Sequence, residues 1–409
     1  MTFNRYIPVT LSAAFVSVTN FFINLLLASF ILIPNDFGIF TFNITLIFLA
    51  VILITSGLPG FFLKQLRGNH INRENEISFY LKRTILLFLL ISISIFLLSI
   101  TFSERLEPLI YFLPLMTAEI CKEFLITKSK LLKNYYLFLY FNAAPITLRA
   151  LFVAYLFLFN KDIQLNNFVL IFGVLSITPL LIFYKTFLKY IIFSITSFRK
   201  KIIFSNNYSW KIPNHIIFNE FSFQLQLRYP ILVSGYLLTE YEISNYAFAW
   251  LFVQCFMIPL GIIQTLIVPQ YYERYSSGKT LISLLYKSLF FAFVLSIATL
   301  IVGSLLEYPH NYFYSKSYPS AFIYMFALLP YVCLRYFSTC FTAYLKTYDR
   351  EKNISDAHIW SISGLILLNI ILFKFELDPL IVISFSLIAS EIIFLSITAI
   401  NSIKIGIKE

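Results

Sequence analysis

Long apolar runs alternate with short polar connections along the whole chain. A helix that crosses a bilayer needs about 20 mainly apolar residues. When the runs are cut at charged residues, proline and glycine, the pattern predicts about twelve spanning helices. These cover residues 7–33, 37–63, 84–102, 108–127, 135–159, 167–192, 216–238, 243–268, 281–306, 318–345, 354–374 and 379–402. The fold class that follows is an all-α integral membrane protein.

Basic residues favour alternate connections. Most of the 31 lysines and arginines lie in connections that would share one side of the membrane. In membrane proteins such basic connections face the cytoplasm. The distribution therefore predicts that both chain termini are cytoplasmic.

A polar connection over 193–215, which carries Arg199-Lys200-Lys201, divides the chain into two halves. The halves resemble each other, because Ser29–Asp36 and Gly235–Glu242 each end a long apolar run in a tight acidic turn. Repeats of the same orientation are common in membrane transport proteins. We expect an N-terminal six-helix lobe over 1–205 and a C-terminal six-helix lobe over 206–409.

Composition supports a lipid environment and narrows the function. The chain is 59% hydrophobic and 12% charged, and its mean hydropathy is +0.80, whereas a soluble domain carries about 25% charged residues. The net charge of +11 belongs to the connections, so we expect no nucleic-acid partner. The predicted outer connections are too short for a catalytic domain, and no nucleotide-binding or metal motif occurs. We expect no enzyme activity, cofactor or metal.

Charged and amide residues inside the predicted spans are the candidate functional residues. An ionisable group at bilayer depth costs about 2.5–3.5 kcal/mol on insertion scales, so it normally faces a protein-lined or aqueous interior. Glu220, Gln224 and Arg228 are spaced four residues apart, which places them on one face of the seventh predicted helix. Asn20 and Asn24 share a face of the first. We expect these two stripes to line a cleft.

The remaining intramembrane charges allow two interpretations. Arg149, Arg228 and Arg335 could bind an anionic substrate, or each could form an internal bridge to a carboxylate. We expect Glu119 and Lys122 to form such a bridge, because they lie three residues apart on a helix. Glu220 and Glu391 are candidates for ion coupling, and Glu391 could equally be the structural partner of an arginine.

Four short stretches together carry a family resemblance. The first hairpin runs from Asn20 through Leu26-Leu27-Ala28 to Pro34-Asn35-Asp36-Phe37-Gly38, and the second predicted helix ends in Gly57–Lys64. The tenth contains Leu328-Leu329-Pro330 and ends in Ala343–Lys352. In order and spacing the chain resembles the Wzx-type O-antigen and polysaccharide flippases, which belong to the multidrug/oligosaccharidyl-lipid/polysaccharide exporter superfamily.

The resemblance implies two six-helix lobes around a central cavity in a bacterial inner membrane. It implies alternating access that moves an undecaprenyl-pyrophosphate-linked oligosaccharide from the cytoplasmic to the periplasmic leaflet. A polysaccharide polymerase and a chain-length regulator would be its partners. Guanidinium groups suit the pyrophosphate, and amides suit sugar hydroxyls, so the expected substrate-binding residues are Arg228, Arg149, Arg335, Gln224, Asn20 and Asn24. One departure concerns the seventh helix, where relatives often carry an acidic residue and this chain has Arg228-Tyr229-Pro230.

Three other functions compete with this interpretation. A cation-coupled multidrug antiporter of the same superfamily would have the same topology, although a pocket for cationic drugs should be acidic and the deep charges here are mainly arginines. A major-facilitator porter should carry a Gly-x-x-x-Asp-Arg-x-Gly-Arg-type motif between its second and third helices, and Lys64–Arg83 does not. A membrane polysaccharide polymerase or ligase would need a longer outer loop.

Overall fold

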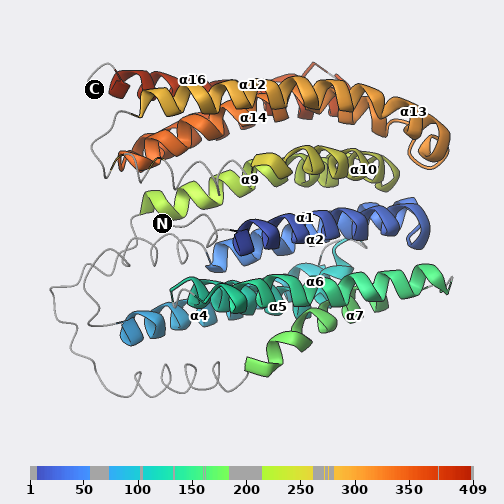
Figure 1. The fold of residues 1–409 in the computed structure, drawn as a ribbon. Helices are drawn as coiled ribbons and strands as arrows, with labels where there is room; N and C mark the ends of the chain where they lie inside the picture. The colour runs from blue at the N-terminus through green and yellow to red at the C-terminus, as the bar shows by residue number, and fades with distance from the viewer. Residues whose placement is uncertain are drawn as a thin grey trace. The chain divides into compact units, whose positions relative to one another are not determined.

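The computed structural model is built from helices (Figure 1). No strand occurs among the residues that the structure describes. Together with ten helices in this part of the chain that are long and apolar enough to cross a membrane, this confirms the predicted all-α membrane fold. The described residues are 7–55, 73–101, 105–131, 134–159, 161, 163–183, 214–260, 271, 275, 281–375 and 377–406.

The chain forms two compact units, each with its own core. Unit 1 comprises Met1–Phe42 and Ser222–Glu409, and unit 2 comprises Asn43–Phe221. The lobe boundary expected between residues 205 and 206 lies outside the described residues, and that division stays a prediction. The Gly57–Lys64 stretch and the basic connection over 193–215 lie mostly or wholly outside them as well.

Unit 1 begins with α1, which passes through a short π-helical turn, η2, into the first turns of α2. Its remaining helices come from the second half of the chain. In order, the elements are α1 (Ile7–Leu26), η2 (Leu27–Ile31), α2 (Pro34–Thr55), α9 (Asn214–Leu237), α10 (Glu240–Phe256), α12 (Ile282–Leu305), α13 (Glu307–Pro309), η5 (His310–Tyr314), α14 (Ala321–Thr347), α15 (Glu351–Phe373) and α16 (Pro379–Gly406).

Unit 2 contains the rest of α2 and the start of α9, with the helices between them. These are α4 (Arg73–Thr101), the 3₁₀ turn η3 (Glu107–Phe112), α5 (Leu113–Leu131), α6 (Tyr135–Leu158), α7 (Leu165–Ile177) and the 3₁₀ turn η4 (Thr178–Phe183). Helix α5 packs against both α6 and α7.

Every predicted span coincides with helix in the described parts of the chain. Ten of these helices are long and apolar enough to cross a membrane. Helices α5 and α9 are not among the ten, because each carries several charged or amide side chains. Helix α4 begins at Arg73, ahead of the predicted span 84–102, and its candidate membrane span, Arg83–Ile100, agrees with that prediction. Helix α12 ends at Leu305, as predicted, and the chain continues through α13 and η5 before α14 begins at Ala321.

Both predicted acidic turns are helix starts. Thr239 caps α10 in a capping box, in which its side chain accepts from the Glu242 backbone N–H and the Glu242 carboxylate accepts from the Thr239 N–H. Pro34 begins α2, with Asp36 in the first turn, where proline and acidic residues are favoured. A Cβ on Gly38 would lie 2.7 Å from the Glu240 carbonyl oxygen, so glycine permits the two helix starts to touch.

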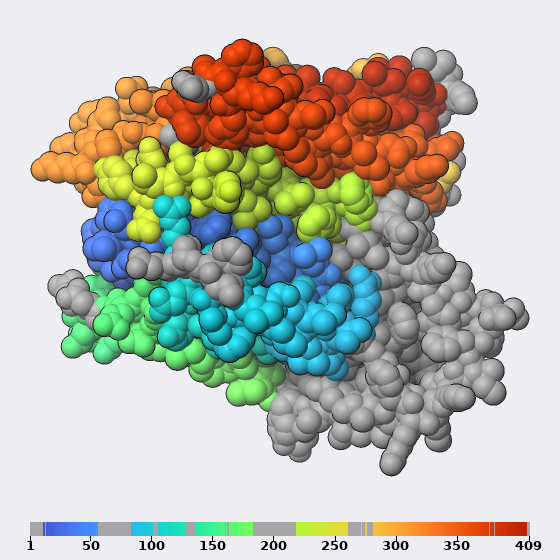
Figure 2. Space-filling view, turned by 180° about the vertical axis from the view of Figure 1, so that it is seen from behind, coloured from blue at the N-terminus to red at the C-terminus, as the bar shows by residue number. Residues whose placement is uncertain are grey.

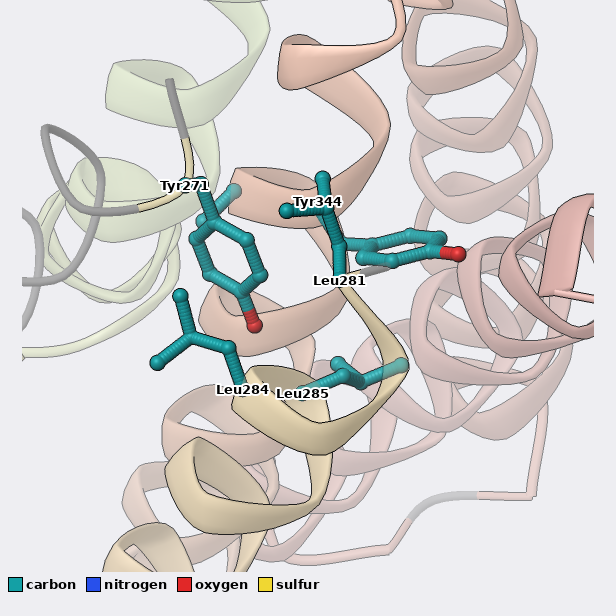
Figure 3. Close-up of a cluster of buried hydrophobic side chains, with 6 residues drawn as sticks. Tyr271, Leu281, Leu284, Leu285 and Tyr344 are labelled. Atoms are coloured by element: carbon teal, nitrogen blue, oxygen red, sulfur yellow. The ribbon is translucent and has the colours of Figure 1, made fainter. Parts of the chain in front are cut away.

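The core of unit 1 is made by α10, α12, α14, α15 and α16, which pack on one another. Figure 2 shows the last three, orange to red, as one closely packed surface. One cluster of this core joins Tyr271 and Leu281 to α12 and α14 (Figure 3). The rings of Tyr271 and Tyr344 meet edge to face at 6.1 Å. Burial raises the pKa of Tyr271 far above its usual range, so its hydroxyl stays protonated, 3.1 Å from Ser288 Oγ.

Candidate functional site

A polar pocket lies where α1 meets α10 in unit 1. Its volume is about 260 Å³. Ser17, Asn20 and Asn24 line it from α1, where their three- and four-residue spacing puts them on one helix face. Gln254 lines it from α10. The two helices contact each other directly. The structure therefore brings the predicted residues Asn20 and Asn24 together with an amide that the sequence analysis missed.

The lining of this polar pocket carries no charge. Besides the three amides and Ser17, it consists of Phe21, Leu251, Cys255, Met257 and Ile258. Gln254 is exposed, and the amides of Asn20 and Asn24 are half-buried.

Among the described residues, no hydrogen bond engages the side chains of Asn20, Asn24 or Gln254. An amide carries two N–H donors and one carbonyl acceptor, and leaving them unsatisfied in an apolar environment costs free energy. These three amides are therefore available to water or to a polar ligand.

On α9, Gln224 and Arg228 lie opposite the helix face that packs into unit 1. Ser222 and Gln226 are fully buried, whereas Glu220, Gln224 and Arg228 are each half-buried. Since successive residues turn by about 100°, Gln226 and Arg228 lie on roughly opposite sides of the helix. Gln224 and Arg228 are thus turned away from the core of unit 1. Substrate binding by Gln224 and Arg228, and ion coupling by Glu220, stay predictions.

Arg335 and Glu391, which the sequence analysis placed in different roles, form one buried ion pair. Arg335 Nη1 lies 2.6 Å from Glu391 Oε2, and neither side chain is more than 2% exposed. Ser338 donates a hydrogen bond to the same carboxylate. The guanidinium also lies over the rings of Phe223 and Phe394, at 4.5 and 5.6 Å. This is the internal bridge that the sequence left open for Arg335.

Gln226 extends this network to a neighbouring helix. Its carbonyl oxygen lies 3.4 Å from Arg335 Nη1, and its amide nitrogen donates to Ser361 on α15. Ser361 in turn donates to the Ser390 carbonyl oxygen at 2.8 Å. Four helices, α9, α14, α15 and α16, are joined by this network. Gln226 was not among the predicted site residues, although its two-residue offset from Gln224 and Arg228 indicates a second polar face.

Arg149 is paired in unit 2. Its Nη2 lies 3.2 Å from Glu119 Oε1, and Lys122 contacts the other oxygen of the same carboxylate, as the i, i+3 spacing predicted. The Arg149 guanidinium also lies 5.3 Å from the Phe172 ring centroid. Arg149 and Glu119 are each 4% exposed. Internal bridges therefore hold both Arg149 and Arg335, and their contact with a substrate stays a prediction.

The described residues contain no group of three or more His, Cys, Asp or Glu side chains that could hold a metal ion. The four cysteines are free thiols within helices or helix ends. The chemistry that the site offers is hydrogen bonding by neutral amides and hydroxyls beside aromatic surfaces.

Neither a protein-family model nor a curated protein matches the amino-acid sequence. Solved structures do match. One is the inward-facing conformation of a multidrug resistance MATE family transporter of the MOP superfamily, with a TM-score of 0.67 at 12% identity over 95% of this chain and 94% of that one. Another is a MOP superfamily transporter from Pyrococcus furiosus Vc1, described as having a binding pocket of reverse polarity. It gives a TM-score of 0.64 at 12% identity over 97% of this chain and 95% of that one.

A third match is the outward-facing conformation of a multidrug resistance MATE family transporter of the same superfamily, with a TM-score of 0.58 at 12% identity over 97% and 93% of the two chains. At such identities the likeness concerns the fold alone. The structural neighbours are MATE family transporters of the MOP superfamily, and this chain has their fold.

Proposed function

We propose that the chain is a membrane transporter that moves an amphiphilic organic molecule by alternating access. The observation that carries this proposal is the polar pocket between α1 and α10. It presents three amides that lack hydrogen-bond partners among the described residues, within a helical fold like that of MATE transporters. The three amides lie within candidate membrane spans, where polar groups are expensive unless they face a cavity or a substrate.

The structural neighbours favour multidrug export, with drug-like molecules as the substrate class. Two of them are described as multidrug resistance transporters. Because the sequence lacks a nucleotide-binding motif, movement against a gradient would draw on an ion gradient. Each charge moved through a membrane potential of 100 mV supplies about 2.3 kcal/mol.

Flipping of an undecaprenyl-pyrophosphate-linked oligosaccharide is the second candidate, and the pocket lining favours it. Asn20, Asn24 and Gln254 can donate to and accept from sugar hydroxyls, and no carboxylate lines the pocket to attract a cationic drug. The internal bridges of Arg149 and Arg335 speak against the full guanidinium clamp that the sequence suggested. Arg228, which is half-buried on α9, stays a predicted partner for the pyrophosphate.

Reconstituted vesicles test the proposal and separate the two substrates. One assay follows uptake of a fluorescent cationic drug driven by a sodium or proton gradient. The other follows the loss of dithionite accessibility of a fluorescent undecaprenyl-pyrophosphate-linked oligosaccharide. We expect Asn20→Leu/Asn24→Leu to reduce whichever activity occurs about tenfold or more, since two to three hydrogen bonds of about 1 kcal/mol each are lost.

The matched control is Gln164→Leu, which replaces an exposed amide at the start of α7 that forms no side-chain cap. It should leave transport unchanged. Wild-type protein that moves neither substrate, in vesicles that hold both gradients, would contradict the proposed function.

A further inference from the structure

An apolar cavity lies beside the polar pocket in unit 1. Its volume is about 290 Å³. Leu25 of α1, Phe248 and Phe252 of α10, Phe313 of η5, and Phe322 and Met325 of α14 line it. No charged side chain lines the cavity. The one imidazole in its lining, that of His310, is hydrogen-bonded through Nε2 to the Tyr318 carbonyl oxygen at 2.8 Å. Such a cavity is suited to hydrocarbon or to an aromatic ring.

The two cavities flank one pair of helices. On α1, Asn24 faces the polar pocket and the next residue, Leu25, faces the apolar cavity. On α10, Gln254 and Cys255 face the polar pocket, whereas Phe252 faces the apolar one. Residues one or two positions apart on each helix therefore divide between a neutral hydrogen-bonding side and an aromatic side.

One aromatic contact joins the linings of the two cavities. Phe21 lines the polar pocket and Phe252 lines the apolar cavity. Their ring centroids lie 5.8 Å apart in an edge-to-face arrangement. A ligand of mixed polarity could reach from one cavity to the other past this ring pair, and a rotamer change of either ring would alter the passage.

We propose that the two cavities form one bipartite site for an amphiphile, with a neutral hydrogen-bonding head in the polar pocket and a hydrocarbon chain in the apolar cavity. This rests on the proposed transport function and names the chemistry of its substrate. Lipid tails are as apolar as the cavity walls, so burial of the chain adds little driving force. The head anchors the molecule, and the shape of the aromatic cavity selects the chain.

A photoactivatable alkyl glycoside tests the bipartite site. The probe carries a neutral sugar head and a diazirine at the end of its chain. It is added to the full-length protein in lipid nanodiscs, and labelled peptides are mapped by mass spectrometry. We expect the chain to label Phe313 and the Phe322–Met325 turn of α14, and an excess of unlabelled glycoside to suppress that label at least fivefold.

Variants locate the two ends of the probe separately. Ala321→Phe, which fills part of the apolar cavity, should lower labelling at least fivefold. Phe313→Ala should lower it about threefold with little effect on folding, because Phe313 is 68% exposed. Ile323→Phe is the matched control on the same helix, 67% exposed and outside the lining, and should leave labelling unchanged. Asn24→Leu should also lower labelling, although Asn24 does not line the apolar cavity.

The response of the Asn24 variant decides between a bipartite site and ordinary lipid. Labelling that persists in Asn24→Leu but falls in Ala321→Phe would show that the cavity holds bulk acyl chains, and would overturn the inference. Labelling that is unchanged in both Asn24→Leu and Ala321→Phe would overturn the inference as well. Label that depends on both cavities in a protein that transports neither substrate would leave the site standing and would contradict only the proposed transport.

Discussion

Polar groups have opposite surroundings in the buried ionic network and in the polar pocket, although both lie in unit 1. Arg335 and Glu391 are charged, almost fully buried and matched to each other, with Ser338 and Gln226 around them. Asn20, Asn24 and Gln254 are neutral, partly accessible and without such partners among the described residues. Full charge is enclosed where it ties helices together, and neutral hydrogen-bonding capacity is left where a ligand could use it.

The difference corrects an assumption that deep charge alone marks a binding site. A buried guanidinium needs a counter-charge wherever it lies, so depth cannot separate a structural arginine from a substrate-binding one. The two kinds of residue are separated by whether their polar atoms already have hydrogen-bond or ion-pair partners within the protein. This division between structural and functional residues can be tested. Substitutions in the network should mainly affect stability, and substitutions in the pocket should mainly affect transport.

Removing the carboxylate of the network should have the largest effect. Glu391→Gln leaves the Arg335 guanidinium buried without its counter-charge, which typically costs about 3–5 kcal/mol. We expect a clearly lower thermal unfolding midpoint for the detergent-solubilised protein, measured by the fluorescence of a thiol-reactive dye. The double variant Arg335→Met/Glu391→Leu removes both charges and should recover most of the loss. A Glu391→Gln protein as stable as wild type would show that the pair is not a structural bridge.

The ionic group of unit 2 should respond less strongly to the same kind of change. Glu119→Gln deprives Arg149 and Lys122 of their shared carboxylate. Lys122 is 15% exposed and can extend toward a polar surface, so mainly Arg149 loses its compensation. We expect a destabilisation of about 2–3 kcal/mol by the same thermal measurement. The neighbouring carboxylate on α5, Glu123, provides the control: Glu123→Gln should shift the midpoint far less, and an equal shift would contradict the assignment.

A neutral hydrogen bond at the α1–α2 turn should have a smaller effect again. The Tyr318 hydroxyl donates to the Ala28 carbonyl oxygen at 2.7 Å, and its ring stacks on Phe248 at 4.3 Å. Tyr318→Phe keeps the ring and removes only the donor, so a loss of about 1 kcal/mol is expected. Tyr318→Leu removes the stacking too and should cost more. Equal midpoints for the two variants would show that the ring contributes nothing.

Much of the fold follows from the sequence because membrane helices must satisfy their backbone internally. Run length and hydropathy located most helices, including the short turn at Thr239, whose cap and acidic third residue are local signals. The start of α4 was missed because its first residues, from Arg73, are polar, and the continuation of α12 into α13 and η5 has no hydropathy boundary at its end.

The candidate site was only half predictable, for a physical reason. The stripe of Asn20 and Asn24 is a periodicity within one helix, so the sequence shows it. Gln254 joins them only because α1 packs on α10, and Arg335 meets Glu391 only because α14 packs on α16. Pairings between helices far apart in the chain need tertiary contacts. A single sequence holds no record of those contacts, and so it could not tell an enclosed charge from an accessible one.

The smallest expected effect on stability is also the sharpest test of the comparison. Asn24→Leu replaces a half-buried amide with a side chain of similar size in an apolar bundle. The free energy of unfolding should therefore change by less than about 0.5 kcal/mol, and the thermal midpoint should stay nearly the same or rise slightly. Transport of the substrate identified in vesicles should nevertheless fall about fivefold or more, because one to two ligand hydrogen bonds are lost. Glu391→Gln should show the opposite pattern, in which the surviving folded protein still transports. If Asn24→Leu lowered stability and left transport intact, the polar pocket would be structural and the enclosed network would become the better candidate for function.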